Sequence, residues 1–438
     1  MSDQHRADVA GFAGDSVART PVLDALAGSG VVFRNAYTPS PICIPARQSL
    51  MMGKLPRNCG CRNFGQDIPP GSMTFARVFA QHAYDAVCSG KLHHLGPDQM
   101  QGWTRRLAPD AIVGERFVEG RVEAEFARYQ PEEGTGKWSN QKEVERAGVG
   151  GGPYQRFDRR ATSAARDFIE DHFASPFYDR PGRHRPLLLK LSLLQPHYPY
   201  LTDEGKFNYY LNRVRTFQEA RSDHPVLGRT QSGPDIHATP RDLRRATAAY
   251  YGMVETMDAH LGEVFEALRH VGQELDEWII VYTTDHGEML GQHGVWEKMQ
   301  FYEASARVPL IVRWPRRFAP RAVDHNVSLC DLFATLCELC HLPVPPGLDS
   351  RSLVPLLSGA KAGFSDEAVS QYGDRVMIKQ GHLKYQYYGK DGAEVLFDLG
   401  VDPGEFRDGA NRPEYRQVMA GFRHRLVELG VTPLIFQA

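Results

Sequence analysis

Apolar and polar positions change their spacing along the chain in a way that predicts alternating strands and helices. Short runs of β-branched and aliphatic residues, typical of strands, occupy positions 31–36, 84–88, 186–194, 278–283 and 309–314. Residues 158–173 and 241–271 instead carry apolar side chains at i+3 and i+4 spacing, which predicts helices. This alternation favours an α/β fold in which a large, mostly parallel sheet is flanked by helices.

The end of the chain has a different pattern. Short strand-like runs at 375–379, 383–388 and 394–398 are separated by turn residues such as Gln380-Gly381. A closing amphipathic helix follows, and its apolar face carries Tyr415, Val418, Phe422, Leu426 and Leu429. We therefore expect an α/β domain over residues 1–363 and a small antiparallel α+β subdomain over residues 364–438.

Residues 131–153 are rich in Gly, Glu and Lys, and we expect them to form a long surface insertion. Within this stretch, positions 148–153 contain too many glycines for any regular element to be expected.

The charge and apolar content of the chain limit the kinds of molecule and compartment with which it is expected to associate. The 438 residues include 51 Lys and Arg against 53 Asp and Glu, so the near-neutral chain has no overall attraction to nucleic acid or to an anionic membrane. The sequence has no run of about 20 apolar residues, so it predicts no membrane-spanning helix. The N-terminus shows no basic segment followed by an apolar one, which favours the cytoplasm, although an exported protein trimmed of its leader would look the same.

Seven cysteines without framework spacing do not describe a disulfide scaffold and favour a reducing compartment. Cys337 and Cys340 have C-x-x-C spacing, but they lie in an apolar helical pattern with no second pair, so we interpret them as core residues.

Candidate chemistry gathers just after the predicted strands. Polar segments follow four of the strands, at 39–47, 89–94, 195–197 and 284–288, and a fifth opens the chain at 2–5. Ligands of open α/β sheets bind at the carboxyl ends of the strands, so these segments are expected to converge.

Cys43 is predicted to lie at a helix N-terminus, because Pro45 suits the first residue of a helix that continues through Arg47. Free amides and the helix dipole favour an anion there, and Arg47 adds a cation one turn later, so a tetrahedral oxyanion would fit. Taken alone, the motif is explained equally well by a buried small residue and a surface charge.

Further polar residues supply a candidate metal site. Oxygen and nitrogen ligands for a divalent cation are available from Asp3, Gln4, Asp285 and His286. Carboxylate and amide oxygens suit Ca²⁺ or Mg²⁺, and the imidazole widens the choice to Mn²⁺ or Zn²⁺.

Other residues could serve the reaction itself. Positive charge for the oxygens of a transferring group is available from Arg47, Lys91 and Lys298. His93 and His197 are candidate general acid and base groups. Each of these residues, taken singly, is more often a solvated or core residue.

Six blocks taken together resemble the formylglycine-dependent sulfatases of the alkaline-phosphatase superfamily. The segment 43–47 is similar to the C-x-P-x-R signature of the family, and 89–93 is similar to its G-K-x-H segment. The remaining blocks occur in the family order at 195–197, 285–287, 294–298 and 307–311. The resemblance covers nearly the whole chain and implies an alkaline-phosphatase-like fold.

The resemblance implies a sulfuric-ester hydrolase whose Cys43 is oxidised to formylglycine by a maturation enzyme. The hydrated aldehyde would attack sulfur, and its second hydroxyl would then allow sulfate to leave. By the same resemblance, one divalent ion, with Ca²⁺ favoured, is held by Asp3, Gln4, Asp285, His286 and the modified Cys43. Arg47, Lys91 and Lys298 would bind sulfate oxygens or the diol, His93 would assist the second step, and His197 would face the leaving oxygen.

Two departures from the family pattern affect these expectations. The family usually has two adjacent acids where this chain has Asp3-Gln4, which weakens the preference for Ca²⁺ over Mn²⁺ or Zn²⁺. The Asp-Gln and Asp-His pairs also resemble the phosphonate monoester hydrolases of the superfamily, so phosphonate or phosphodiester hydrolysis is an alternative. A non-catalytic oxyanion-binding relative is a third interpretation.

The second departure is an apolar strand that the family places immediately before the metal-binding acids. This chain starts at Met1 without it, so we expect unpaired neighbouring strands, a frayed Asp3 and poor metal binding that an upstream strand would restore.

The expected partners are a small-molecule or carbohydrate sulfate ester and the maturation enzyme, with homo-oligomers left open. Trp103, Tyr198 and Tyr200 could form a cage for a choline ammonium, whereas Arg105 and Arg106 favour an acidic sugar or an aryl sulfate.

Overall fold

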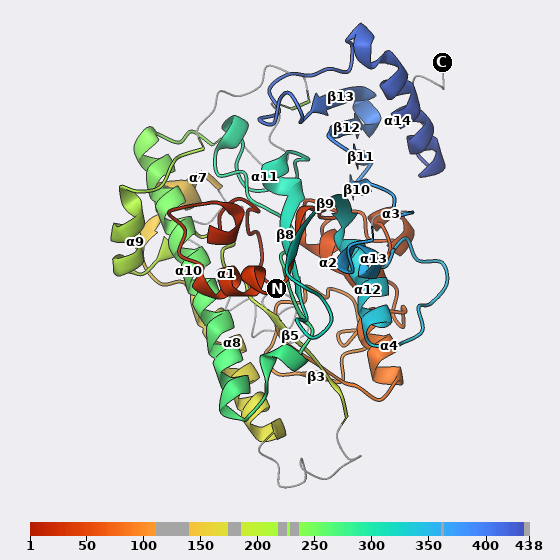
Figure 1. Ribbon diagram of the computed structural model, residues 1–438. Coiled ribbons are helices and arrows are strands. Elements are labelled where there is room, and N and C mark those ends of the chain that lie inside the picture. The colour runs from red at the N-terminus through yellow and green to blue at the C-terminus, as the bar shows by residue number, and fades with distance from the viewer. Residues whose placement is uncertain (111–139, 174–184, 218–225, 228–235, 361–362, 433–438) are drawn as a thin grey trace.

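The computed structural model describes residues 1–110, 140–173, 185–217, 226–227, 236–360 and 363–432 (Figure 1). The strands of the α/β part form two principal sheets. One has the order β7-β8-β1-β9, made of Ile280–Thr283, Arg307–Arg313, Val31–Tyr37 and Arg321–Ser328. The other has the order β3-β2-β5, made of Arg105–Arg106, Asp85–Gly90 and Leu187–Ser192.

Strand direction is mixed in the first sheet and uniform in the second. Strand β1 runs parallel to β9 and antiparallel to β8, which also pairs antiparallel with β7. Strand β2 runs parallel to both of its neighbours. The predicted α/β class is confirmed, and the strands are divided between two sheets.

The first two residues connect these sheets. The Met1 carbonyl accepts a hydrogen bond from the Leu193 amide at 2.9 Å, and the Ser2 amide donates to the Thr283 carbonyl at 3.0 Å. Beyond this bridge, β5 and β7 do not pair, and an apolar cavity of about 210 Å³ lies between them. The expected fraying of Asp3 is wrong, because this residue is completely buried.

Helices cover both faces of the sheets (Figure 1). One core includes the helices α1, α8 and α10, which span Pro21–Gly28, Pro153–Phe173 and Pro240–His270. A second core includes α2, α4, α12 and α13, which span Cys43–Met52, Phe75–Gln81, Leu332–Leu339 and Val354–Leu357. Shorter helices are α3 (Pro56–Cys59), α7 (Asn140–Glu145), α9 (Glu204–Leu211) and α11 (Glu303–Ala306).

The prediction for residues 131–153 is wrong where the structure describes them, and positions 131–139 lie outside the described residues. Helix α7 is followed by strand β4 (Gly148–Val149), which pairs in parallel with β6 (Leu201–Thr202), and α8 begins at Pro153. The pairing uses backbone groups, since the Gly148 amide donates to the Tyr200 carbonyl at 3.0 Å. Glycines that look like loop residues can therefore form a strand.

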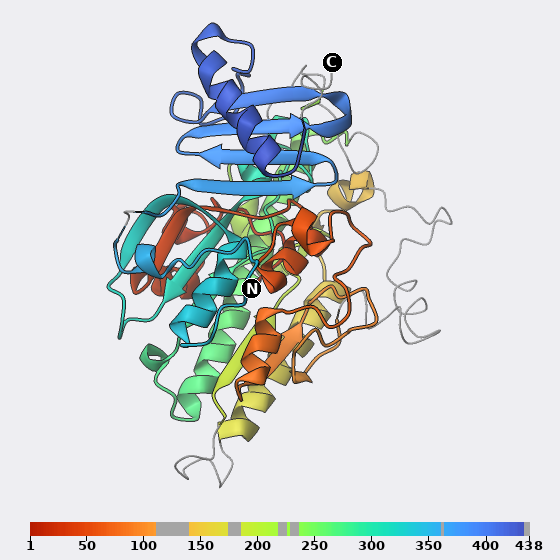
Figure 2. The same cartoon turned by 90° about the vertical axis from the view of Figure 1, so that its right-hand side faces the viewer.

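The expected C-terminal subdomain is observed (Figure 2). Its antiparallel sheet has the order β10-β11-β12-β13, made of Glu367–Tyr372, Arg375–Gln380, Leu383–Tyr388 and Ala393–Asp398. Helix α14 (Arg416–Glu428) packs on it, with Phe422 stacked on Tyr385 at a centroid distance of 5.2 Å. Strand β10 was not expected, and the boundary after residue 363 stays a prediction.

A buried charge cluster lies where this subdomain meets α11. Lys384 Nζ donates to the Glu303 carboxylate at 2.8 Å and to the Glu405 carboxylate at 2.6 Å. The remaining oxygens are also satisfied, because Glu405 accepts from the Glu303 amide and Glu303 pairs with Arg307. We call these three residues, Lys384, Glu303 and Glu405, the junction cluster.

Two expectations concern cysteines and membranes. All seven cysteines are free thiols, and Cys337 is buried in the second core, as expected. Within the described part of the chain, no helix is both long enough and apolar enough to span a bilayer.

Candidate active site and metal centre

Strand ends and one helix start bring the expected site residues together. Asp285 and His286 follow β7, Lys91 follows β2, and His197 follows β5, while Cys43 is the first residue of α2. Helix α2 begins two residues earlier than expected, after the extended Ile42. A side chain at Gly90 would meet the Ser192 carbonyl, with its Cβ at 2.1 Å, so only glycine lets β2 approach β5 this closely at the site.

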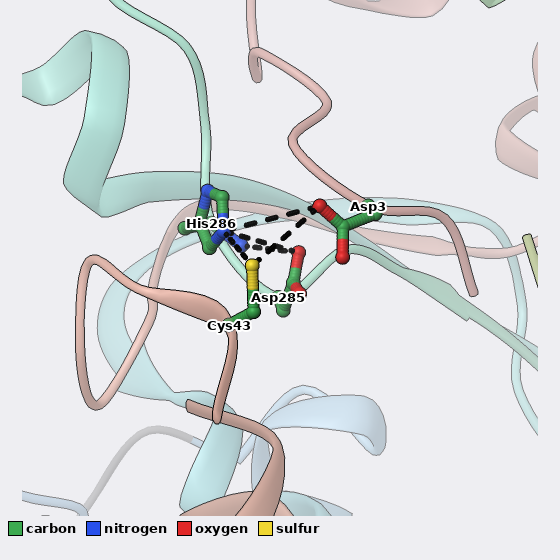
Figure 3. A group of neighbouring side chains, drawn as sticks. All are labelled: Asp3, Cys43, Asp285 and His286. Atoms are coloured by element: carbon green, nitrogen blue, oxygen red, sulfur yellow. Dashed lines mark hydrogen bonds and ion pairs between the residues drawn. The ribbon is translucent and has the colours of Figure 1, made fainter. Parts of the chain in front are cut away.

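Four buried side chains converge on one point (Figure 3). One potential ligand atom from each of Asp3, Cys43, Asp285 and His286 lies within 4.8 Å of every other. The Cys43 Sγ is 3.1 Å from His286 Nε2 and 3.8 Å from the Asp3 carboxylate. Position 43 and the carboxylate of 285 therefore meet, as the sequence predicts.

Arg47 holds the carboxylates of Asp3 and Asp285 in place. Its guanidinium donates to Asp3 at 2.9 Å and to Asp285 at 2.8 Å, and all three side chains are fully buried. Lys91 Nζ adds a second cation to Asp3 at 2.7 Å. Burial alone would raise the pKa of Asp3, but Lys91 and Arg47 outweigh it and hold this pKa well below its usual range.

The thiol at position 43 is in an electropositive setting. Burial and the Asp3 charge raise the pKa of Cys43, but Lys298, Lys91 and His286 together lower it below its ordinary value. An anionic oxygen in place of this sulfur would be stabilised by the same charges.

Gln4 has its amide fixed in one orientation. Its Oε1 accepts a hydrogen bond from Lys298 Nζ at 2.6 Å, and its Nε2 donates to the buried Glu288 carboxylate. Because a carboxylate only accepts, Glu288 requires the amide NH₂ on its side and turns the amide oxygen toward the site. Glu288 also accepts from the Tyr200 hydroxyl at 3.0 Å.

His197 and Lys298 form a direct contact, with 2.7 Å between Nε2 and Nζ. An ammonium only donates, so His197 Nε2 is the acceptor, and its Nδ1 donates to the Tyr198 carbonyl at 2.6 Å. Burial, followed by the Lys298 charge, holds the pKa of His197 well below its ordinary value. This imidazole is therefore neutral at neutral pH.

His93 is buried, and both of its ring nitrogens lack a partner among the described residues. Burial and the Lys91 charge hold the pKa of His93 well below its ordinary value. Its ring meets the half-exposed Phe64 edge-on, at a centroid distance of 5.6 Å. A neutral, unpartnered imidazole at this position is available to a substrate.

The donor set fits a divalent cation. His286 Nδ1 lies 3.0 Å from the Gly287 carbonyl, so this nitrogen donates and the lone pair of Nε2 faces the other ligands. Asp3 Oδ1 has only long contacts, at 3.8 Å to Cys43 and 4.0 Å to His286. Asp3 Oδ1 and His286 Nε2 therefore present lone pairs to one point. The Asp285 carboxylate and the Gln4 amide oxygen lie beside them and already accept hydrogen bonds from the protein.

The sequence did not reveal two supporting residues. Glu288 belongs to the polar segment after β7, but its contact with Gln4 links positions far apart in the chain. Asp158 accepts hydrogen bonds from the Leu194 and Gln195 amides at 2.6 and 2.8 Å and so fixes the turn that presents His197. A lone acid in an amphipathic helix gives no signal of this role.

The aromatic residues considered as a cage are separated. Trp103 packs against Phe75 in the second core, with 5.7 Å between centroids. Tyr200 is buried and donates its hydroxyl to Glu288. The Tyr198 ring instead lies against the His197 ring, and its centroid is 5.2 Å from Lys298 Nζ. The expected three-residue cage is therefore wrong.

Comparison with protein families and curated proteins gives consistent matches. Residues 1–342 match the model described as sulfatase, and residues 291–432 match the model described as N-sulphoglucosamine sulphohydrolase, C-terminal. A choline-sulfatase from Rhizobium meliloti is 31% identical over 90% of this chain and 78% of its own length. An arylsulfatase from Clostridium perfringens is 26% identical over 98% of this chain and 92% of its own.

Solved structures share the fold. The phosphonate monoester hydrolase of Agrobacterium radiobacter superposes with a TM-score of 0.77 at 24% identity, over 98% of this chain and 94% of its own. A protein solved with its substrate D-glucosamine-2-N,6-O-disulfate gives 0.76 at 18% identity, over 98% and 96%.

Proposed function

Because the chain belongs to the sulfatase family and is a sulfuric-ester hydrolase, we propose that its nucleophile is a formylglycine derived from Cys43. The resemblance seen in the six sequence blocks is thus confirmed at the level of the family. The proposal is supported by one observation above all: Cys43 Sγ lies within 4.8 Å of a potential ligand atom from each of Asp3, Asp285 and His286.

We further propose that one divalent ion, with Ca²⁺ favoured over Mn²⁺, Mg²⁺ and Zn²⁺, is held by Gln4 and by four residues that we call the ligand cluster: Asp3, Cys43, Asp285 and His286. Such an ion supplies positive charge that makes a hydroxyl more nucleophilic and polarises the sulfate group. Arg47 orients the two ligand carboxylates through its hydrogen bonds. Two carboxylates among three cations leave the site electropositive, which suits a sulfate anion.

The surrounding residues have separate tasks in this proposal. Lys91 and Lys298 neutralise sulfate oxygens, where charge develops as the S–O bond breaks. Neutral His93 accepts the proton of the second hydroxyl of the nucleophile, so that sulfate can leave. The Lys298–His197 pair shares one proton between Nζ and Nε2, and that proton passes to the leaving oxygen.

Mass spectrometry of the peptide containing Cys43 tests the nucleophile directly. Protein co-produced with a formylglycine-generating enzyme should contain a peptide about 18 Da lighter than the cysteine form. An unmodified thiol in that protein would contradict the proposal and favour a non-catalytic oxyanion-binding protein.

Comparison of two substrates tests the reaction class. An aryl sulfate should be cleaved with a higher kcat/KM than phenyl phosphonate by the metal-loaded, modified enzyme. The reverse order would identify a phosphonate hydrolase that uses the same residues.

A further inference from the structure

A basic pocket lies between α3 and the C-terminal sheet, where Figure 1 places α3 beside β10. It has a volume of about 310 Å³, within the range of small-ligand sites. Four cations line it, and these are Arg57, Arg62, Arg375 and Lys390. We call these residues with their cavity the basic pocket.

Charge in the basic pocket is not balanced by the protein. Among the residues that the structure describes, none of the four cations forms an ion pair with a carboxylate. The single acid in the lining is Asp374, whose Oδ2 instead accepts the Lys390 amide at 2.9 Å. Like charges gathered around a cavity repel one another, and an anion within it relieves the repulsion.

Arg375 gives the strongest local sign of a missing partner. Its Nη1 is buried and has no hydrogen-bond partner, although its guanidinium lies 5.7 Å from the Tyr388 ring. Buried polar nitrogens are nearly always paired, so this one points to an acceptor from outside the chain. Burial, followed by the Arg62 charge, lowers the pKa of Arg57, as expected of two guanidiniums close together.

The basic pocket is connected to the active site by one loop. The Gly373 amide donates to the Arg62 carbonyl at 3.1 Å, which ties the β10–β11 turn to this loop. Phe64 follows two residues later and contacts the His93 ring. Two residues span at most about 7 Å, so the loop reaches from the basic pocket to the catalytic imidazole.

We propose that the basic pocket is a second anion-binding subsite, which holds a sulfate or carboxylate group of an acidic oligosaccharide. The guanidiniums suit this ligand because their planar donors pair with two oxygens at once. A small aryl sulfate would not reach the subsite, whereas a polyanionic chain of several sugar rings would engage both sites. The assignment of substrate class rests on the proposed function, but anion binding by the basic pocket does not.

Binding of a fluorescent sulfated chondroitin hexasaccharide to the full-length protein tests the subsite. The double variant Arg57→Gln/Arg62→Gln should bind about tenfold more weakly than wild type, since charge-assisted hydrogen bonds are lost. The matched double variant Arg269→Gln/Arg316→Gln removes two exposed charges elsewhere and should bind like wild type. Equal weakening in both double variants would overturn the proposal, because only general attraction would then be measured.

Further measurements separate the sources of the anion. An unsulfated hyaluronan hexasaccharide should bind more weakly than the sulfated one and should lose affinity in the same variant. Inorganic sulfate that displaces the hexasaccharide at an equal concentration would overturn the oligosaccharide assignment in favour of the free ion.

Turnover distinguishes failure of the subsite from failure of the proposed function. Cleavage of an aryl sulfate should be unchanged in Arg57→Gln/Arg62→Gln, while KM for the sulfated hexasaccharide should rise. An unchanged KM and an unchanged affinity would reject the subsite and leave the proposed function intact. Specific binding without release of sulfate from any ester would reject the proposed function and support the subsite.

Discussion

The ligand cluster and the junction cluster are both buried groups of opposite charges, but they differ in how their oxygens are used. In the junction cluster, every carboxylate oxygen of Glu303 and Glu405 has a donor within hydrogen-bond distance. In the ligand cluster, Asp3 Oδ1 has only long contacts. A cluster whose oxygens all have donors, which we call closed, holds two parts of the fold together. A cluster with an acceptor oxygen left over, which we call open, can bind a ligand from outside the chain.

The largest effect is expected when the ligand cluster loses Cys43. Cys43→Ala should lower kcat/KM for an aryl sulfate by at least about 10⁴-fold, because the nucleophile is removed. The small side chain should leave the free energy of unfolding within about 1 kcal/mol of wild type. Residual turnover within tenfold of wild type would place the nucleophile elsewhere.

Breaking the closed cluster should affect stability. Lys384→Met leaves the buried Glu405 and the partly buried Glu303 without their shared cation and should cost about 3–5 kcal/mol in the free energy of unfolding, measured with urea.

The matched control is Lys206→Met, which breaks the surface pair with Asp203 and should cost less than about 1 kcal/mol. Equal losses in the two variants would show that the junction cluster contributes no more than a surface ion pair.

A smaller effect, on metal affinity, is expected when the support of Gln4 beside the ligand cluster is removed. Glu288→Gln should weaken divalent metal binding about 10–100-fold, since the Gln4 amide is no longer forced to present its oxygen. Isothermal titration with Ca²⁺ or Mn²⁺ measures this loss. Tyr200→Phe removes a neighbouring hydrogen bond to Glu288 without freeing Gln4, and its metal affinity should stay near wild type.

A further expected effect concerns the dependence of stability on pH. Burial, partly offset by the Leu194 and Gln195 amides, raises the pKa of Asp158 from 3.8 to about 7. A raised carboxyl pKa stabilises the fold at low pH, and this contribution is lost as the pH rises from about 4 to about 7. Asp158→Asn does not titrate, so the difference in unfolding free energy between wild type and the variant should shrink across that window. A constant difference would show that Asp158 is ionised throughout.

Much of the site was predictable because the chemistry of parallel strand ends is simple. Polar residues after the parallel strands β2 and β5 lie at one end of their sheet, and those after β7 lie beside them although β7 belongs to the other sheet. Asp285 and His286 therefore lie near Lys91, which contacts Asp3, and near His197, which contacts Lys298. The classes of element followed from the periods of apolar residues, as in α10 and the C-terminal strands.

Other features depend on contacts that leave no local pattern. Pairing of β4 with β6 uses backbone groups of a glycine-rich segment, and apolar periodicity does not report backbone hydrogen bonds. Glu288 and Asp158 act through partners more than thirty positions away, so neither residue is marked by its neighbours. Strand β8 runs antiparallel to β1, and this direction depends on pairing between segments far apart in the sequence, which the pattern within each strand does not reveal.

Helix α2 begins at Cys43, and this side chain is 1% exposed. The loop before it is fastened from two distant segments, as the Pro39 carbonyl accepts from the Gln371 amide and the Pro41 carbonyl from the Met299 amide, both at 2.8 Å. A modifying enzyme needs its target thiol accessible, which the finished fold denies. In the proposed maturation, oxidation of this cysteine would therefore have to occur before the chain has folded around it.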